Sequence, residues 1–188
     1  MVTTRKLRSE HYTSGEKALT RQEYDKLLSV ITDLQDELLI RMAVATGLRR
    51  EDLCDIKVAD IVVPEKRLQF YEAKKKKWRE IDLPDAVIVT LKKYWNMLDK
   101  KEQGREYLFT FVGRTAYTHF NNWCRVAGIP ERPFHALRAT CTKFAHDAGW
   151  TDEQISKLTG DRIDTIQLHY RTPSVGEMAQ VTQSKSFA

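Results

Sequence analysis

Hydrophobic positions follow helical spacing along most of the chain, and the first such stretch has a clear start. Thr20-x-x-Glu23 has the form of a capping box, in which each residue bonds the other's backbone N–H. Tyr24, Leu27 and Leu28 follow at i, i+3 and i+4. This spacing places them on one face and predicts a helix that begins at residue 20.

The next apolar stretch, residues 38–45, is hydrophobic on nearly all sides. A helix without a polar face is usually a buried one, so we expect this segment at the centre of the core. Gly47 is its expected end. Residues 48–53 (L-R-R-E-D-L) then place charge directly at the end of the most buried element, which is unusual for a core helix.

The pattern changes between residues 60 and 83. Residues 60–63, 67–71 and 78–83 read as three short strands. The link between the last two carries four consecutive lysines, residues 74–77, at the tip of a predicted hairpin. Most such lysines are solvated surface. A hairpin tip can also reach into a groove, where one ammonium could meet a leaving oxygen.

The second half returns to helical spacing. Helices are predicted over 84–98, 115–127 and 134–148, with a loop at 100–105 and a short extended piece at 107–109. A second capping box, Thr151-x-x-Gln154, begins a last helix that ends at Gly160. The order of elements predicts an α+β fold: a mainly helical domain with a small three-stranded antiparallel sheet. We divide the chain into a linker or arm (1–18), this domain (19–172) and a C-terminal tail (173–188).

Composition supports a single globular domain. The chain has 188 residues, 41% hydrophobic and 30% charged. No apolar run approaches the roughly 18 residues of a membrane span, and the N-terminus lacks a signal-peptide stretch. The net charge of +5 is only weak support for a polyanionic partner. Three scattered cysteines exclude a disulfide framework or a cysteine zinc site, so we expect a soluble protein of the cytoplasm.

The helix predicted from Phe134 has two distinct faces. The core stripe consists of Leu137, Cys141, Phe144 and Ala148. His135 and Arg138 are i, i+3 neighbours on the other face, which Thr142 and His146 prolong. This face is either a solvated one with edge histidines or a paired donor set for one phosphate, since an arginine fork binds two phosphate oxygens.

Arg49 has two readings as well. It could simply pair with Asp52 or Glu51. A second arginine at the end of a rigid core helix, however, suits a fixed electrostatic task.

Four of these motifs together resemble the tyrosine recombinases, the phage-integrase and Xer-type enzymes. Residues 45–53 (A-T-G-L-R-R-E-D-L) resemble the box around the first catalytic arginine of that family, and residues 135–138 (H-A-L-R) resemble its H-x-x-R box. Residues 158–161 (L-T-G-D), with Tyr170 nine residues later, are similar to its L-G-H…Y ending. A lysine before the strand that bears Arg79 and Ile81 resembles its hairpin lysine, and Lys74 aligns best. The resemblance covers residues 19–172 and rests on the order of the motifs, because each one alone is weak.

The resemblance implies a role for each matching residue. Arg49 and Arg138 would clamp the scissile phosphate, and Tyr170 would attack it to form a 3′-phosphotyrosine link to DNA. Lys74 would be the general acid, and His135 would assist proton movement. The remaining matches are Asp52, which would orient Arg49, and the DNA-binding candidates Arg50, Lys75, Lys76 and Lys77. Since cationic neighbours would activate the phenol, the resemblance implies neither metal nor ATP.

The sequence departs from the family in two ways. Asp161 stands where the family usually has histidine or tryptophan. Because of its place in the motif, we still count Asp161 among the catalytic positions. A carboxylate would repel the phosphate, so we expect Asp161 to pair with Arg138 or His135, or to accept a hydrogen bond from Tyr170. The second helical domain that usually precedes the catalytic one cannot be supplied by residues 1–18. The family also implies a tail that packs on a neighbouring protomer and a tetramer on double-stranded DNA.

Other functions stay open at this point. The clamp could serve a DNA-binding domain without turnover, and a type IB topoisomerase shares the chemistry. A third possibility is a basic helical domain that binds RNA or protein. In that case the joint placement of Arg49, Arg138 and Tyr170 would be a coincidence. Tyr170, taken by itself, could be a structural tyrosine whose ring is packed against the protein and whose hydroxyl is exposed to water.

Overall fold

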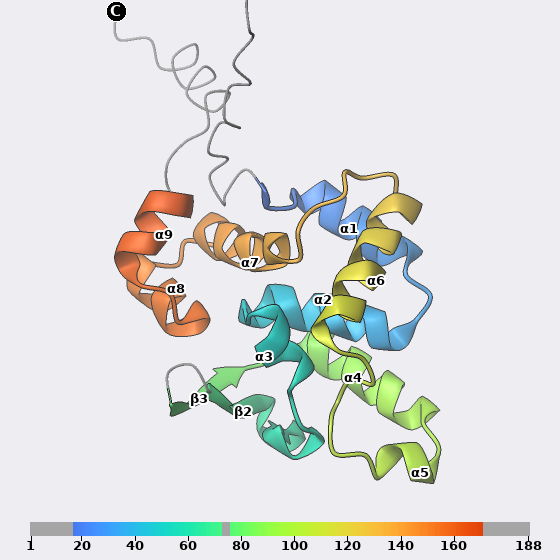
Figure 1. Ribbon diagram of the computed structural model, residues 1–188. Coiled ribbons are helices and arrows are strands. Elements are labelled where there is room, and N and C mark those ends of the chain that lie inside the picture. The colour runs from blue at the N-terminus through green and yellow to red at the C-terminus, as the bar shows by residue number, and fades with distance from the viewer. Residues whose placement is uncertain (1–16, 73–75, 171–188) are drawn as a thin grey trace, which may run out of the picture.

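The computed structural model describes residues 17–72 and 76–170, with side chains described as far as residue 167. Figure 1 shows helices surrounding a central one, with a small sheet on one side. The helices are α1 (Arg21–Val30), α2 (Leu34–Thr46), α3 (Arg50–Cys54), α4 (Asp85–Met97), α5 (Lys100–Gln103), α6 (Gly113–Val126), α7 (His135–Asp147), α8 (Asp152–Thr159) and α9 (Ile163–Tyr170). The strands are β1 (Ile61–Val62), β2 (Arg67–Glu72) and β3 (Lys77–Asp82). The predicted α+β fold is confirmed.

Both predicted capping boxes are present. Thr20 and Glu23 bond each other's backbone N–H at the start of α1. Thr151 and Gln154 do the same for α8. The two helices therefore begin where their side chains satisfy backbone donors that have no partner inside the helix.

Helix α2 is the centre of the core, as its hydrophobic sequence predicts. It contacts α3, α4, α6 and α7. Leu38, Leu39 and Met42 are completely buried. The helix begins four residues earlier than the apolar run, because Asp33 accepts a hydrogen bond from the N–H of Asp36 and caps it.

The sheet is antiparallel in the order β1-β2-β3. In β2, alternate residues Leu68, Phe70 and Glu72 are buried, so a carboxylate follows two apolar side chains on the inner face. The register pairs Leu68 with Ile81 and Glu72 with Lys77. The first predicted strand is shorter than expected, because Val63–Glu65 forms a 3₁₀ turn in which Pro64 has no N–H for the ladder.

Three predictions in the second half need correction. The expected loop at 100–105 contains α5, which a further capping box, between Asp99 and Glu102, supports. Helix α9 lies beyond Gly160, where no helix was predicted. In α7, the face that the sequence left as either solvated or phosphate-binding is partly buried: Arg138 and Thr142 are inside the protein. Ala148, assigned to the core, is exposed.

The three cysteines are all buried and unpaired. Burial raises the pKa of the Cys54 thiol to about 12, so it is not a reactive thiolate. Within the described residues, no helix combines the length and the apolar character that a membrane crossing requires.

Candidate active site

Arg49 stands at the junction between α2 and α3. Gly47 ends α2 in the left-handed conformation (φ 61°). A side chain here would also collide, since a Cβ would lie 2.9 Å from Thr159 Cγ2 and 3.1 Å from Cys141 Sγ. Glycine thus allows the end of the core helix to touch α7 and α8. Arg49 follows two residues later as the N-cap of α3, at the meeting point of these helices.

Carboxylates surround the Arg49 guanidinium. Its Nη1 donates to Glu72 Oε1 at 3.2 Å and lies 3.9 Å from Asp52 Oδ2. Its Nη2 lies 3.8 Å from Asp161 Oδ1. The side chain is still 35% exposed, so one side remains accessible to a ligand. The pairing of Arg49 with Asp52 that the sequence left open exists, but it is the longest of the three contacts. Burial raises the pKa of the Asp52 carboxyl.

Arg138 is the buried arginine of the site, with 3% of its surface exposed. Its Nη1 donates to the backbone carbonyl of Gly47, and its Nη2 donates to that of Thr159 at 2.9 Å. Its Nε donates to Asp161 Oδ2 at 3.0 Å, and Nη2 is 2.6 Å from Asp161 Oδ1. The side chain therefore fastens α7 to the ends of α2 and α8.

Asp161 follows the C-cap glycine of α8 and pairs with cations. Of the two cationic candidates, Arg138 is the partner that the structure gives it. The backbone around Asp161 is held as well: its N–H donates to Thr159 Oγ1 at 3.2 Å, and its carbonyl accepts from Ser156 Oγ at 2.7 Å. The two arginines from distant parts of the sequence thus meet at one carboxylate.

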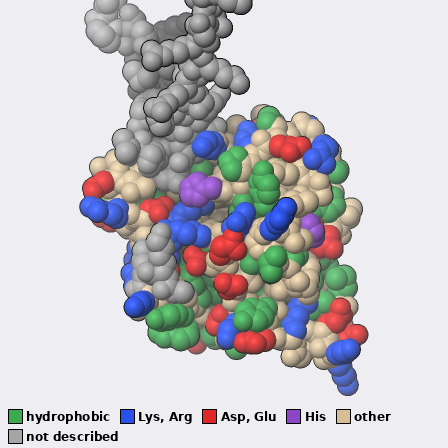
Figure 2. Space-filling view, viewed as in Figure 1, with side chains coloured by type: hydrophobic (Ala, Val, Ile, Leu, Met, Phe, Trp, Pro, Cys, Tyr) green, Lys and Arg blue, Asp and Glu red, His purple; other side chains and the backbone are tan. Residues whose placement is uncertain are grey.

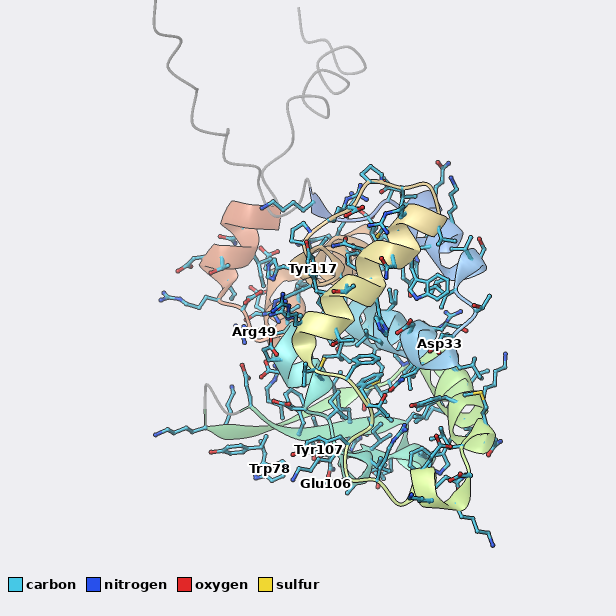
Figure 3. All side chains as sticks on the ribbon, turned by 45° about the vertical axis from the view of Figure 1, so that its right-hand side comes forward. Asp33, Arg49, Trp78, Glu106, Tyr107 and Tyr117 are labelled. Carbon is cyan, nitrogen blue, oxygen red and sulfur yellow. The ribbon has the colours of Figure 1, made fainter. Side chains whose placement is uncertain are left out.

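A cavity of about 510 Å³ opens beside the arginines. Arg49, Arg138, His135, Arg50 and Tyr117 are among its lining residues. Of the residues labelled in Figure 3, Arg49, just before α3, and Tyr117, on α6, both line this cavity. Its volume is in the range of small-ligand sites. An anion-sized group can therefore reach the exposed side of Arg49.

His135 is on the rim of this cavity, at the first position of α7. Although the residue is exposed as a whole, partial burial of the imidazole lowers its pKa, and the charge of Arg138 lowers it further. Asp161 acts in the opposite direction. Because its ordinary value is about 6.5, the imidazole is mainly neutral at neutral pH.

We expect the His135 imidazole to titrate below an ordinary histidine. The folded chain disfavours the protonated ring, so the unfolded chain binds more protons, and this group costs stability as the pH falls below about 6.5. An NMR titration of the ring proton signals, assigned with His135→Gln, measures the midpoint. A midpoint at or above about 6.5 would contradict the expected effects of burial and of the Arg138 charge.

The hairpin lysines are described only in part. Lys74 and Lys75 lie outside the described residues. Lys76 and Lys77 are exposed, and Lys76 has a positive φ of 51°. Lys77 is already the first residue of β3, which therefore starts one residue before the predicted strand 78–83.

Tyr170 is the last residue of α9, and its side chain is not among those described. No distance therefore joins its hydroxyl to the arginines. Its role as nucleophile stays a prediction.

Two charged residues of this network were missed by sequence reasoning. Glu72 is completely buried and binds both Arg49 and Arg79, the latter at 3.4 Å. Arg79 also donates to the carbonyls of Lys157 at 3.0 Å and Leu158 at 2.6 Å, at the end of α8. Alternation in β2 was the available signal, because it puts a carboxylate on the inner face, where a cation must accompany it.

Charges of both signs are mixed on this side of the molecule. Figure 2 shows Lys and Arg side chains (blue) interspersed with Asp and Glu (red) across the middle of the face. At the cavity, Arg50 Nη2 lies 2.6 Å from Glu51 Oε1. The described residues contain no group of three or more His, Cys, Asp or Glu side chains placed to hold a metal ion.

The Phage integrase family matches residues 17–174. The chain therefore belongs to the phage integrase family, the family of the tyrosine recombinases.

Curated relatives include two archaeal Xer proteins. Tyrosine recombinase XerA of Pyrococcus furiosus is 29% identical over 167 residues, which cover 82% of this chain and 57% of the relative. Tyrosine recombinase XerA of Thermococcus onnurineus is 32% identical over 165 residues, which cover 81% of this chain and 57% of the relative. The chain spans little more than half the length of these relatives.

Solved structures share the fold. The crystal structure of XerA recombinase superposes with a TM-score of 0.75 at 20% identity, covering 91% of this chain and 66% of that one. The catalytic domain of bacteriophage HP1 integrase gives 0.63 at 20% identity, covering 90% of this chain and 95% of that one. A lambda integrase dimer bound to a COC′ core site gives 0.67 at 25% identity, covering 90% of this chain and 62% of that one.

Proposed function

We propose that this chain is the catalytic part of a site-specific DNA recombinase that cleaves and rejoins strands through a 3′-phosphotyrosine intermediate. The observation that carries the proposal is the meeting of Arg49 and Arg138 beside one cavity, in a chain of the phage integrase family. Guanidinium groups suit this reaction, because phosphoryl transfer needs charge stabilisation and in-line placement more than a strong base.

Each residue then has a task in the reaction. Arg49 and Arg138 hold the non-bridging phosphate oxygens and stabilise the pentavalent transition state. The Tyr170 phenolate attacks phosphorus, and the 5′ oxygen leaves with a proton from Lys74. His135, largely neutral, accepts or returns a proton at the phosphate. Asp52 orients Arg49. The ester stores the energy of the broken bond, so religation needs no ATP.

The proposed partner is double-stranded DNA. Arg50 lines the cavity, and Lys76 and Lys77 extend from the hairpin, where they can neutralise backbone phosphates. We further propose a tetramer on DNA, with residues 173–188 contacting a neighbouring protomer, and a cytoplasmic location, where DNA of a mobile element or chromosome is accessible.

A nicked suicide duplex tests the proposal. The duplex releases a short fragment after cleavage and so traps the covalent protein–DNA adduct, which survives detergent. We expect an adduct with the natural chain and none with Tyr170→Phe. Single replacement of each lysine from 74 to 77 then identifies the general acid, because one variant should lose most of the cleavage. An adduct that persists in Tyr170→Phe would refute the assigned nucleophile.

A DNA-binding domain without turnover is the second candidate. The contact of Asp161 with both arginines favours it, because a carboxylate on the clamp opposes a phosphate. Duplex binding with no adduct from any cognate site would support this candidate. Relaxation of supercoiled DNA without exchange of strands would instead indicate an activity like that of type IB topoisomerases.

A further inference from the structure

One oxygen atom lies between the two arginines of the site. Asp161 Oδ1 is 2.6 Å from Arg138 Nη2 and 3.8 Å from Arg49 Nη2. A phosphate held by both arginines, as the proposed function requires, would place a non-bridging oxygen at the same point. The carboxylate and the phosphate therefore compete for one position.

Arg138 has no nitrogen without a protein oxygen beside it. Nη1 and Nη2 donate to the backbone carbonyls of Gly47 and Thr159, and Nε and Nη2 face the Asp161 carboxylate. The two carbonyls belong to helix ends that the core holds in place. Among these partners, only the carboxylate of Asp161 belongs to a side chain and can move by rotation. A phosphate can gain the Nε–Nη2 edge of Arg138 only by displacing it.

The charges of the cluster balance. Three carboxylates accompany the three guanidinium groups, and the six residues are Arg49, Arg79, Arg138, Asp52, Glu72 and Asp161. A cluster with equal numbers of opposite charges attracts an added anion weakly. Removal of one carboxylate from the arginines gives the site a net positive charge.

We propose that Asp161 is an internal anion that occupies the phosphate position in the chain without DNA and leaves it by side-chain rotation when a phosphodiester binds. This inference rests on the proposed function. Because hydrogen bonds to Thr159 and Ser156 fix the backbone of Asp161, the exchange needs only a change of side-chain rotamer.

The exchange favours the transition state over the substrate. A phosphodiester carries one negative charge, the same as the carboxylate it replaces, so the ground state gains little. The pentavalent transition state formed by an attacking phenolate carries a second negative charge and holds the arginines more strongly. Interactions that strengthen in this way raise the rate rather than only the affinity.

Titration with inorganic phosphate tests the inference on the full chain. Arginine Nε–H signals of the ¹⁵N-labelled protein report binding at low ionic strength and constant pH. We expect Asp161→Asn to bind phosphate about tenfold more tightly than the natural chain, because a like charge has been removed. Asp164→Asn is the matched control: it removes the same charge three residues away, where the carboxylate is exposed and pairs with Arg162 at 3.0 Å. Its affinity should change little.

Two further variants make the result decisive. The gain should disappear when Arg49→Ala is added to Asp161→Asn, which places the anion at the clamp. Asp161→Ser, another neutral side chain, replaces Asp161→Asn if that variant does not fold. Phosphate binding by either that is no tighter than that of Asp164→Asn overturns the inference.

The adduct assay separates this inference from the proposed function. Tighter phosphate binding by Asp161→Asn without any adduct from the natural chain would leave the internal anion in place and refute the recombinase. An adduct without the gain in phosphate binding would refute the internal anion alone.

Discussion

Replacing Arg138 with alanine lowers the free energy of unfolding by about 3–5 kcal/mol, the usual cost of breaking a buried ion pair from one side. The variant leaves Asp161 near Arg49 alone and removes the donors that the carbonyls of Gly47 and Thr159 now accept. Adduct formation should also fall by about a thousandfold, because the proposed function has Arg138 stabilise the charge of the transition state. Urea denaturation and single-turnover cleavage measure the two effects.

A second variant separates stability from catalysis. Adding Asp161→Asn to Arg138→Ala removes the uncompensated carboxylate, so part of the lost stability should return while cleavage stays as low as in Arg138→Ala. Arg138→Lys keeps the charge but not the planar fork, and we expect it to remain inactive. Additive stability losses in Arg138→Ala and Asp161→Asn would show that the pair contributes no coupling energy.

Replacing Glu72 with glutamine should destabilise the fold by about 2 kcal/mol, because hydrogen bonds to charged groups are the strong ones and this carboxylate serves two of them. Arg79, whose side chain is 8% exposed, would lose its charged partner. Arg49 would lose its shortest contact, so the rate of cleavage should fall more than the affinity for DNA. Thermal unfolding, DNA binding and single-turnover rates distinguish these effects.

Glu80 offers the matched control for Glu72. It lies on the neighbouring strand, exposed, and accepts from Gln69 at 3.0 Å. Glu80→Gln should change stability by less than about 0.5 kcal/mol. Equal effects of the two substitutions would mean that the buried ion pairs of Glu72 contribute no more than an exposed carboxylate.

Much of the fold is predictable because local chemistry determines it. Capping boxes at Thr20 and Thr151 mark helix starts through bonds between neighbours in sequence, and the unbroken apolar run of residues 38–45 requires burial. Helix α9 was missed since its mixed sequence, I-D-T-I-Q-L-H-Y, gives little periodicity. Its helicity comes with packing on α7 and α8.

The site was predictable at the level of residue type. The order of the motifs singled out Arg49, His135 and Arg138, and the structure gathers all three at one cavity. Their partners were harder to predict, because Glu72 and Arg79 come from the sheet and reach the arginines across the fold. Sequence spacing carries no information about such distant contacts. The assigned roles of Lys74 and Tyr170 remain predictions.

The attachment of Arg79 to the carbonyls at the end of α8 has a mechanical consequence. The strand that carries Arg79 also carries the lysine hairpin, whereas α8 leads into the segment that ends at Tyr170. One guanidinium, that of Arg79, would therefore connect the segment of the proposed proton donor to the segment of the proposed nucleophile. A force that DNA exerts on the hairpin would be transmitted to the segment that ends at Tyr170, on the other side of the reacting phosphorus.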